Sequence, residues 1–178
     1  GSDRYTYDPL DLSSQVQADS TDVAALTDQR GVLLGNGRQV VYHSAPFTRA
    51  TDLAGFFRLQ AWIEIDQRDT DIVASVYELR PDGTSIFLAG DQLRARYRQD
   101  ATREQLVTPG AIEAWDFDQF SFVARTLGVG SRLGRVGGLL DGLAVAVLQL
   151  RVGELHLRDL HGDVGGRREP GSQDEEPA

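Results

Sequence analysis

The chain has 178 residues, a length that suits one domain with a single core or a fragment of a larger protein. Arginine supplies all 18 basic charges against 27 Asp and Glu, so the formal net charge is −9 and the pI is near 4.7. This acidic balance argues against nucleic acid and anionic membrane surfaces as partners. Cysteine is absent, which excludes disulfides, zinc–thiolate sites and thiol catalysis.

Other absences bear on the origin of the chain. It has no Met, and Gly1-Ser2 is typical of a cloning remnant or of the cut edge of a fragment. Lys is also absent and Asn36 is the only Asn, which predicts a GC-rich, bacterial coding sequence. The longest apolar run, around 143–148, is far shorter than the roughly 18 residues of a membrane span. We therefore expect a soluble domain, and its compartment, cytoplasmic or secreted, stays open.

In chain order, residues 1–38 are expected to form an irregular lead-in, because they are polar and contain the turn signal Gly35-Asn36-Gly37. A β-sandwich is predicted from residue 39 to 135, starting with a short strand at Val40-Val41-Tyr42. Apolar and polar residues then alternate from Phe57 to Asp66, which is the period of a strand with one buried face.

The residues that follow predict more strands. Ile72 to Leu79 is apolar on both faces, as in a central strand of a sandwich, and Pro and Gly at 80–84 predict a hairpin turn after it. Asp91 to Arg98 is polar and is expected to form a helical turn or a loop. Further strands are predicted at Ser85–Ala89, Ile112–Phe117 and Phe120–Arg125.

Short strands separated by turns favour an all-β fold with two packed sheets. Periodicity alone leaves jelly-roll and immunoglobulin-like topologies open. The same pattern predicts a core that includes Phe57, Leu59, Ala61, Ile63, Val73, Val76 and Phe122.

Several motifs are more specific than this periodicity. The segment from Asp69 to Thr84 (DTDIVASVYELRPDGT), followed by GDQLRARYR at 90–98, resembles the C-terminal domain of X-prolyl dipeptidyl-peptidases and cocaine esterase. Tyr5-Thr6-Tyr7-Asp8-Pro9 is similar to the family's Y-x-Y-D-P at the start of that domain. Ser44-Ala45-Pro46 and Gly130-Ser131-Arg132-Leu133 match an S-x-P and a late G-S-R-[LI] motif.

The resemblance covers roughly residues 5–133. It implies a galactose-binding-like jelly-roll β-sandwich that follows an α/β-hydrolase domain. The Ser-Asp-His triad of such hydrolases lies in the hydrolase domain, so the resemblance implies a noncatalytic domain that braces its partner and walls the active-site cleft. The parent enzyme would cleave an ester or an amide through an acyl-enzyme. Two alternatives stay open, a free-standing carbohydrate-binding module and an interaction module with no small ligand.

No catalytic residue is predicted in the chain itself. The nucleophile motif G-x-S-x-G is absent, because Ser131 is flanked by Val129 and Leu133 where glycines are needed. His43 and Ser44 are adjacent in sequence, which gives no triad geometry.

Three groups of side chains are candidates for a binding role. Asp66, Asp69 and Asp71 could hold calcium, although a β-turn whose carboxylates accept backbone N–H groups is favoured. The arginines could clamp an anion, although pairing with carboxylates at a domain junction is favoured. The aromatic residues could stack on a sugar, although cross-strand packing is favoured. The arginines are Arg94, Arg96 and Arg98, and the aromatic residues are Trp62, Trp115 and Phe117.

The tail at 136–178 does not resemble the family. One possible DNA sequence for Leu143 to Arg151, when read in a frame shifted by one base, encodes Trp-Gln-Trp-Gln-Phe-Tyr-Asn-Ser. This peptide is similar to a motif of the family, so we predict a frameshift between Leu133 and Leu143. The sandwich would then be incomplete, with a short helix at Leu143 to Leu150, disorder from Gly162 and poor packing from Leu140 to Ala178. For this reason a metal-like pattern in the tail is discounted, and no metal or cofactor is predicted. That pattern consists of His156, Asp159, His161 and Asp163.

Overall fold

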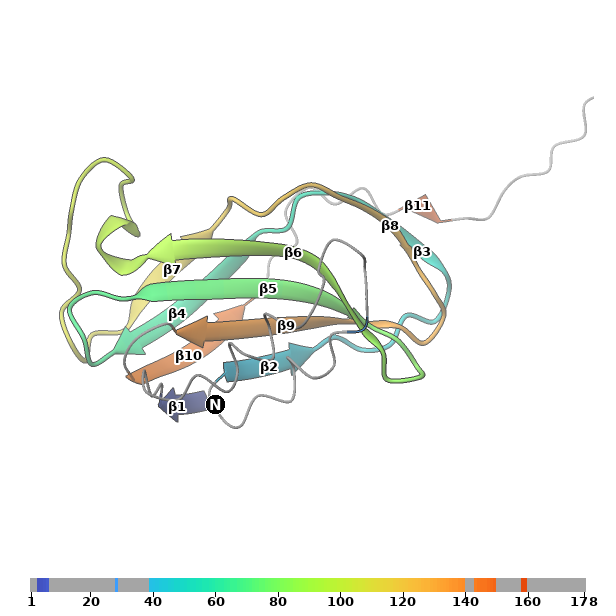
Figure 1. Cartoon of the computed structure of the whole chain (residues 1–178), viewed down its shortest axis with the longest axis horizontal. Coiled ribbons are helices and arrows are strands. Elements are labelled where there is room, and N and C mark those ends of the chain that lie inside the picture. Colours follow the sequence, from blue (N-terminus) through green and yellow to red (C-terminus); the bar gives the residue numbers. More distant parts are fainter. Residues whose placement is uncertain (1–2, 7–27, 29–38, 140–142, 150–157, 160–178) are drawn as a thin grey trace, which may run out of the picture.

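The computed structural model describes residues 3–6, 28, 39–139, 143–149 and 158–159, and the described residues are almost entirely β (Figure 1). The first five strands are β1 (Asp3–Thr6), β2 (Gln39–His43), β3 (Thr51–Gly55), β4 (Leu59–Ile65) and β5 (Asp71–Leu79). β6 (Ser85–Arg94) runs into a 3₁₀ turn, η1 (Ala95–Tyr97). The remaining strands are β7 (Glu113–Phe117), β8 (Val123–Leu127), β9 (Arg132–Leu139), β10 (Leu143–Gln149) and β11 (Arg158–Asp159).

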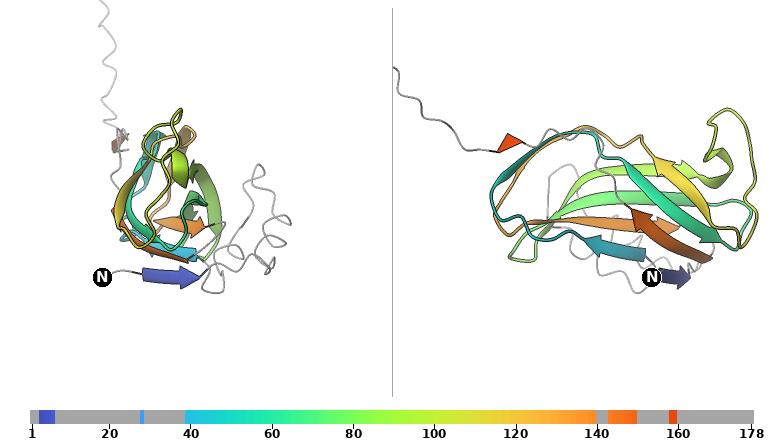
Figure 2. Two further views of the ribbon diagram at one scale, coloured as in Figure 1. Left: turned by 90° about the vertical axis from the view of Figure 1, so that its left-hand side faces the viewer. Right: turned by 180° about the vertical axis from the view of Figure 1, so that it is seen from behind.

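The strands form two four-stranded sheets and one three-stranded sheet, all antiparallel. The orders are β2-β9-β5-β6, β1-β10-β4-β7 and β11-β3-β8. The two four-stranded sheets form two layers, and the β3–β8 pair extends the molecule at one end (Figures 1 and 2). The predicted all-β sandwich is confirmed, whereas the jelly-roll topology stays a prediction.

One core cluster fills the space between the layers. β4 shows the predicted alternation, with Leu59, Ala61, Ile63 and Ile65 buried and the residues between them half-exposed. Val40, Ile72, Ala74 and Val76 come from the other layer. Leu53, Val123 and Leu127 come from the three-stranded sheet. Because all three sheets contribute to the cluster, the described strands share a single hydrophobic core.

The hairpin between β5 and β6 has the predicted turn. Arg80 and Thr84 pair through the backbone, and the N–H of Gly83 donates to the carbonyl of Arg80 at 2.9 Å. The Asp82 carboxylate accepts from the backbone and the hydroxyl of Thr84 at 2.9 and 2.7 Å. Gly83 has φ +85°, which suits a residue without a Cβ.

Two of the predicted core residues are wrong. Phe122 is 59% exposed, because β8 begins at Val123, three residues after the predicted start, and buries Val123 instead. Val73 is only partly buried, because Ile72, Ala74 and Val76 occupy the inward face and the period of two places Val73 on the other face. Phe57, Leu59, Ala61, Ile63 and Val76 are buried as predicted.

Some predicted elements also need correction. β6 continues to Arg94, so only Ala95–Tyr97 of the segment predicted as a helical turn or loop is helical. The short helix predicted at Leu143 to Leu150 is wrong, because β10 is a strand with β1 on one side and β4 on the other. Backbone pairing along both edges outweighs a weak helix propensity over seven residues. The parts of the lead-in and tail predictions at 7–27, 29–38, 140–142, 150–157 and 160–178 lie outside the described residues.

Candidate functional site

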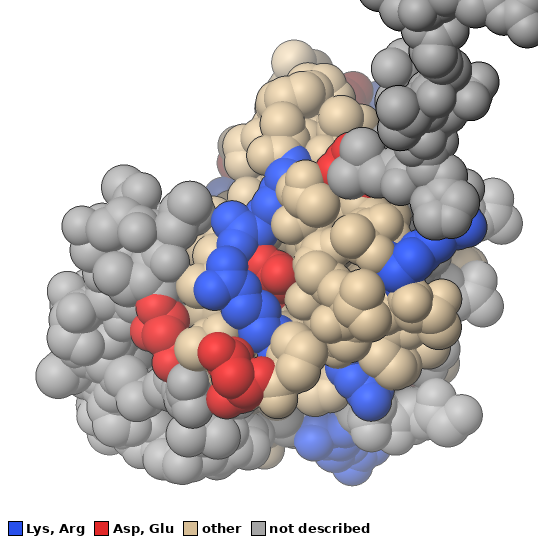
Figure 3. All heavy atoms as spheres, turned by 90° about the vertical axis from the view of Figure 1, so that its right-hand side faces the viewer, with Lys and Arg blue, Asp and Glu red and all other residues tan. Residues whose placement is uncertain are grey.

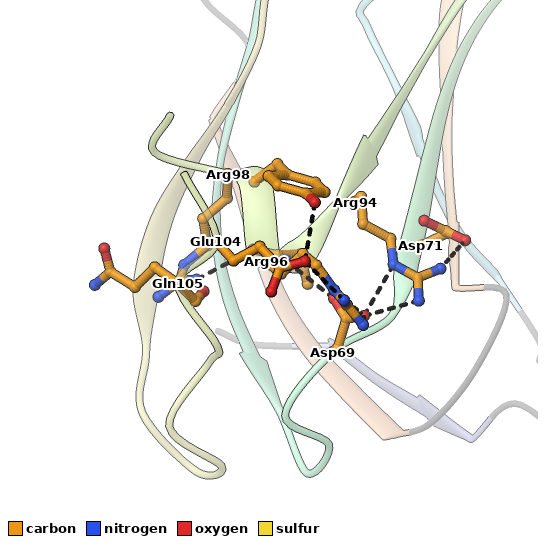
Figure 4. A network of polar contacts seen from close by, with 9 residues as sticks. Asp69, Asp71, Arg94, Arg96, Arg98, Glu104 and Gln105 are labelled. Carbon is orange, nitrogen blue, oxygen red and sulfur yellow. Dashed lines mark hydrogen bonds and ion pairs between the residues drawn. The ribbon is translucent and has the colours of Figure 1, made fainter. Parts of the chain in front are cut away.

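The β4–β5 turn and the end of β6 bring three charged side chains together. The register of the hairpin pairs Asp71 with Arg94, and Asp69 lies two residues before Asp71. Arg94 contacts Asp69 Oδ2 through Nη2 at 2.8 Å and Asp71 Oδ2 through Nη1 at 2.7 Å. Two oppositely charged strand ends are thereby joined at one end of the sandwich (Figure 4).

The network continues through η1. Arg96 contacts Asp69 Oδ2 through Nη2 at 2.6 Å and Glu104 Oε1 through Nη1 at 3.1 Å. Its backbone N–H donates to Asp69 Oδ1 at 3.0 Å, and the Tyr97 hydroxyl donates to Glu104 Oε1 at 3.0 Å. Glu104 belongs to the loop that follows η1, so the network ties this loop to the start of β5 (Figure 4).

These contacts bear on the roles predicted for the aspartate cluster and the arginine cluster. Asp69 accepts a backbone N–H, which is the structural role favoured from the sequence, and the remaining contacts of Asp69 and Asp71 are with guanidinium groups. Within the described residues, no three His, Asp or Glu side chains converge as metal ligands would. The arginines likewise pair with carboxylates of the same domain, and their place at a domain junction stays a prediction.

The network shifts the pKa of its members. Burial alone would raise the pKa of Asp69, but hydrogen bonds from the Arg96 side chain and backbone and from Arg94 outweigh it and lower the pKa. Hydrogen bonds from Tyr97 and Arg96 lower the pKa of Glu104. The hydrogen bond to Glu104 raises the pKa of Tyr97. Each shift favours the charge state that the network needs at neutral pH.

Asp69→Asn is expected to lower stability more at pH 7 than in acid. A carboxyl with a lowered pKa stabilises the fold above its unfolded pKa, near 3.8, and this contribution is lost as the pH falls through the folded value. Urea unfolding midpoints at pH 7 and pH 3 measure the difference. Asp116→Asn, on the exposed side of β7, is the matched control for the same chemical change and should lower the midpoint at pH 7 by less than Asp69→Asn does. A deficit of Asp69→Asn that is equal at both pH values would contradict the prediction.

Arg98 lies deeper than the other two arginines and makes a different set of contacts. Its side chain is 2% exposed, and Nε and Nη2 each lie 2.6 Å from Glu113 Oε2 on β7. Nη1 donates to the backbone carbonyls of Ala95 and Gln105 at 3.1 and 2.5 Å. The guanidinium carbon is 5.9 Å from the ring centroid of Trp115, within cation–π range. Arg98 therefore fastens η1 and the following loop to the opposite sheet.

A second cluster, at the other end of β5, was missed from the sequence. Glu78 is 3% exposed, and Arg125 of β8 contacts its Oε2 through Nη2 at 2.6 Å. Arg80 reaches the same oxygen at 3.5 Å, and the Ser131 hydroxyl donates to Oε1 at 3.1 Å. Figure 3 shows this end of the molecule, where basic side chains form a band and an acidic side chain lies next to it. An acidic residue at an inward position of an apolar strand was the signal available, because it needs a buried partner.

The serines considered as nucleophiles are both engaged in structural hydrogen bonds. Ser131 is buried and donates to Glu78. The Ser44 hydroxyl donates to the carbonyl of Ala45 at 2.8 Å and accepts from the N–H of Leu133 at 3.0 Å. His43 is exposed at the end of β2.

The aromatic residues considered for sugar stacking lie mainly in the core. Trp115 and Phe117 are fully buried and pair across strands with Ala61 and Leu59, which confirms cross-strand packing for these two residues. Trp62 is half-buried on the outer face of β4. In the metal-like pattern of the tail, Asp159 pairs with Thr51 in β11, and the other three residues lie outside the described ranges.

Comparison with protein families decides what this domain is. A family described as "X-Pro dipeptidyl-peptidase C-terminal non-catalytic domain" matches residues 2–134. The chain belongs to this family. The match covers β1 to β8 and ends within β9, close to residue 133, where the sequence motifs also end.

Solved structures share the fold. An aminopeptidase from a marine sediment thaumarchaeon matches with a TM-score of 0.69 and 18% identity, over 86% of this chain and 31% of its own. An α-amino acid ester hydrolase matches with a TM-score of 0.66 and 16% identity, over 83% and 30%. A CocE/NonD family hydrolase from Staphylococcus aureus matches with a TM-score of 0.59 and 14% identity, over 85% and 33%. This X-Pro dipeptidyl-peptidase C-terminal domain thus spans about a third of each of these proteins.

No curated protein sequence matches the chain. Among the described residues, no helix has the length and apolar character needed to cross a bilayer.

Proposed function

We propose that this domain is the noncatalytic C-terminal β-sandwich of a serine hydrolase of the X-prolyl dipeptidyl-peptidase or acyl esterase type. It braces an α/β-hydrolase domain and forms part of the wall of its active site. The observation that carries the proposal is the family match over residues 2–134, which comes with a noncatalytic description. The similar structures include an aminopeptidase and an ester hydrolase, whose amide and ester substrates both suit acyl transfer.

The arginine network suits a bracing role. Arg96 and Arg98 hold the loop at 99–112 against the sandwich through Glu104, Gln105 and Glu113. A loop fixed at several points can present a defined surface to a partner without an ordering cost on contact. The alternative of a carbohydrate-binding module is not favoured by the aromatic residues, because Trp115 and Phe117 are buried.

The chain alone is expected to hydrolyse neither X-Pro dipeptide amides nor short acyl esters above background. The Ser131 hydroxyl is buried against Glu78, and that of Ser44 is bonded to the backbone, so neither is placed as a nucleophile. Chromogenic amide and ester assays with the 178-residue chain measure this. Turnover that disappears in Ser131→Ala or Ser44→Ala would contradict the expectation.

The bracing role is tested by adding the chain to a catalytic domain. The α/β-hydrolase domain of the parent enzyme, produced separately, should gain thermal stability and kcat/KM when the 178-residue chain is added. Both changes should saturate with the concentration of the chain, since a bound partner stabilises the folded state by mass action. A catalytic domain with the same Tm and kcat/KM in the presence and absence of the chain would overturn the proposal.

A further inference from the structure

Two connections cross between sheets side by side. β3 pairs with β8, and β4 pairs with β7, so the connections 56–58 and 118–122 pass together from the three-stranded sheet to a four-stranded one. Gly55, at the start of this bend, has φ +145°, a conformation that favours glycine. The bend is therefore a built feature of the sandwich rather than a loose loop.

Aromatic rings pair on both sides of the bend. On the inner side, Phe57 and Phe120 are buried, with ring centroids 6.3 Å apart and an interplanar angle of 72°. On the outer side, Phe56 and Phe122 meet edge to face at 5.4 Å and 71°. The outer rings are 57% and 59% exposed. The core anchors the bend from within, so the outer pair is displayed at a fixed position.

The surroundings of the outer pair have the composition of an interface. Arg58 and Asp118, from the same two connections, form an exposed ion pair at 3.5 Å. An apolar aromatic centre beside charged, exposed groups is the usual arrangement of a protein–protein contact. Aromatic side chains at fixed positions are also frequent energetic hot spots. We name Phe56, Arg58, Asp118 and Phe122 the bend patch.

We infer that the bend patch is an anchor of the contact with the α/β-hydrolase domain, an inference that rests on the proposed function. The similar structures contain this fold in about a third of their length, so most of each chain is left to form a partner within the same protein. A second copy of this acidic chain, with a net charge of −9, is repelled and fits less well. A sugar ring needs a flat face, which two rings inclined at 71° do not offer.

The test uses the 178-residue chain and the separately produced α/β-hydrolase domain of the parent enzyme. Phe56→Ser combined with Phe122→Ser should weaken Kd, measured by calorimetry, by at least about tenfold relative to wild type. Val129→Ser is the matched control, because Val129 is 62% exposed and lies outside both the patch and the loop at 99–112. Circular dichroism should show unchanged folding, because all three substituted side chains are exposed.

The outcomes separate this inference from the proposed function. If the wild-type chain does not bind the hydrolase domain, both are overturned. If it binds and the double variant binds equally well, only the bend patch is overturned. Sedimentation that shows a wild-type dimer lost in the double variant, or oligosaccharide binding lost in it, would also overturn the inference, because the occupant would be another molecule. In the archaeal aminopeptidase, the positions matching Phe56 and Phe122 should contact the rest of that chain, and solvent exposure there would count against the patch.

Discussion

Arg98→Met is expected to lower the free energy of unfolding by about 2–3 kcal/mol, below the roughly 3–5 kcal/mol lost when one partner of a fully buried ion pair is removed, because the Glu113 side chain is 24% exposed. The substitution leaves Glu113 beside an apolar side chain and removes both donors to Oε2. It also leaves the carbonyls of Ala95 and Gln105 without this donor and removes the cation over Trp115. Urea unfolding followed by tryptophan fluorescence measures the change.

Arg94→Met is the matched control for this prediction. Like Arg98, Arg94 forms ion pairs, here with two carboxylates, but its side chain is 45% exposed. Water can therefore replace the lost contacts and screen the charges that remain. The loss of stability should be much smaller than that of Arg98→Met. Equal losses of stability in the two variants would show that burial does not determine how much each arginine stabilises the fold, and would contradict the prediction.

The sequence predicted the fold where periodicity and burial coincide. In β4, Leu59 to Ile65 alternates, since one face packs on the core and the other is half-exposed, and the strand was found within two residues. The β5–β6 hairpin was found because Pro81, Asp82 and Gly83 encode its turn locally.

Elements that depend on distant partners were harder to predict. β10 lies between β1 and β4, about 140 and 84 residues away in sequence, and its own residues suit helix or strand. The error at Phe122 has a local cause, because the alternation does not say at which residue a strand begins, and a shift of one residue exchanges the faces. The frameshift hypothesis stays a prediction, and sequencing the gene through the codons for 133–143 tests it.

The two charge clusters also differ in whether their partners are close in sequence. Asp69, Asp71, Arg94 and Arg96 belong to adjacent ends of one hairpin, so their pairing could be anticipated from an acidic turn followed by arginines. The Glu78 cluster could not, because Arg125 and Ser131 lie 47 and 53 residues further along the chain. The inward position of Glu78 in an apolar strand implies only that its charge needs partners, and the fold identifies them.

Phe117→Ala is expected to lower the free energy of unfolding of the 178-residue chain by about 3–5 kcal/mol, whereas Phe122→Ala should cost less than about 1 kcal/mol. Phe117 is 1% exposed in the centre of the core, opposite Leu59, so truncation leaves a cavity that the packed sheets cannot fill. Phe122 is 59% exposed and meets Phe56 edge to face at the surface, so truncation there leaves no enclosed space.

The same two variants should rank in the opposite order when the measured quantity is the affinity for the hydrolase domain. If Phe122 anchors the contact with the hydrolase domain, Phe122→Ala weakens the complex while the isolated chain keeps its stability. Phe117→Ala instead destabilises the isolated chain, and any loss of binding should follow the fraction unfolded. Urea unfolding of each variant, followed by titration with the hydrolase domain under conditions where both are folded, separates the two effects. A Phe122→Ala variant that unfolds as readily as Phe117→Ala would mean that Phe122 belongs to the core after all.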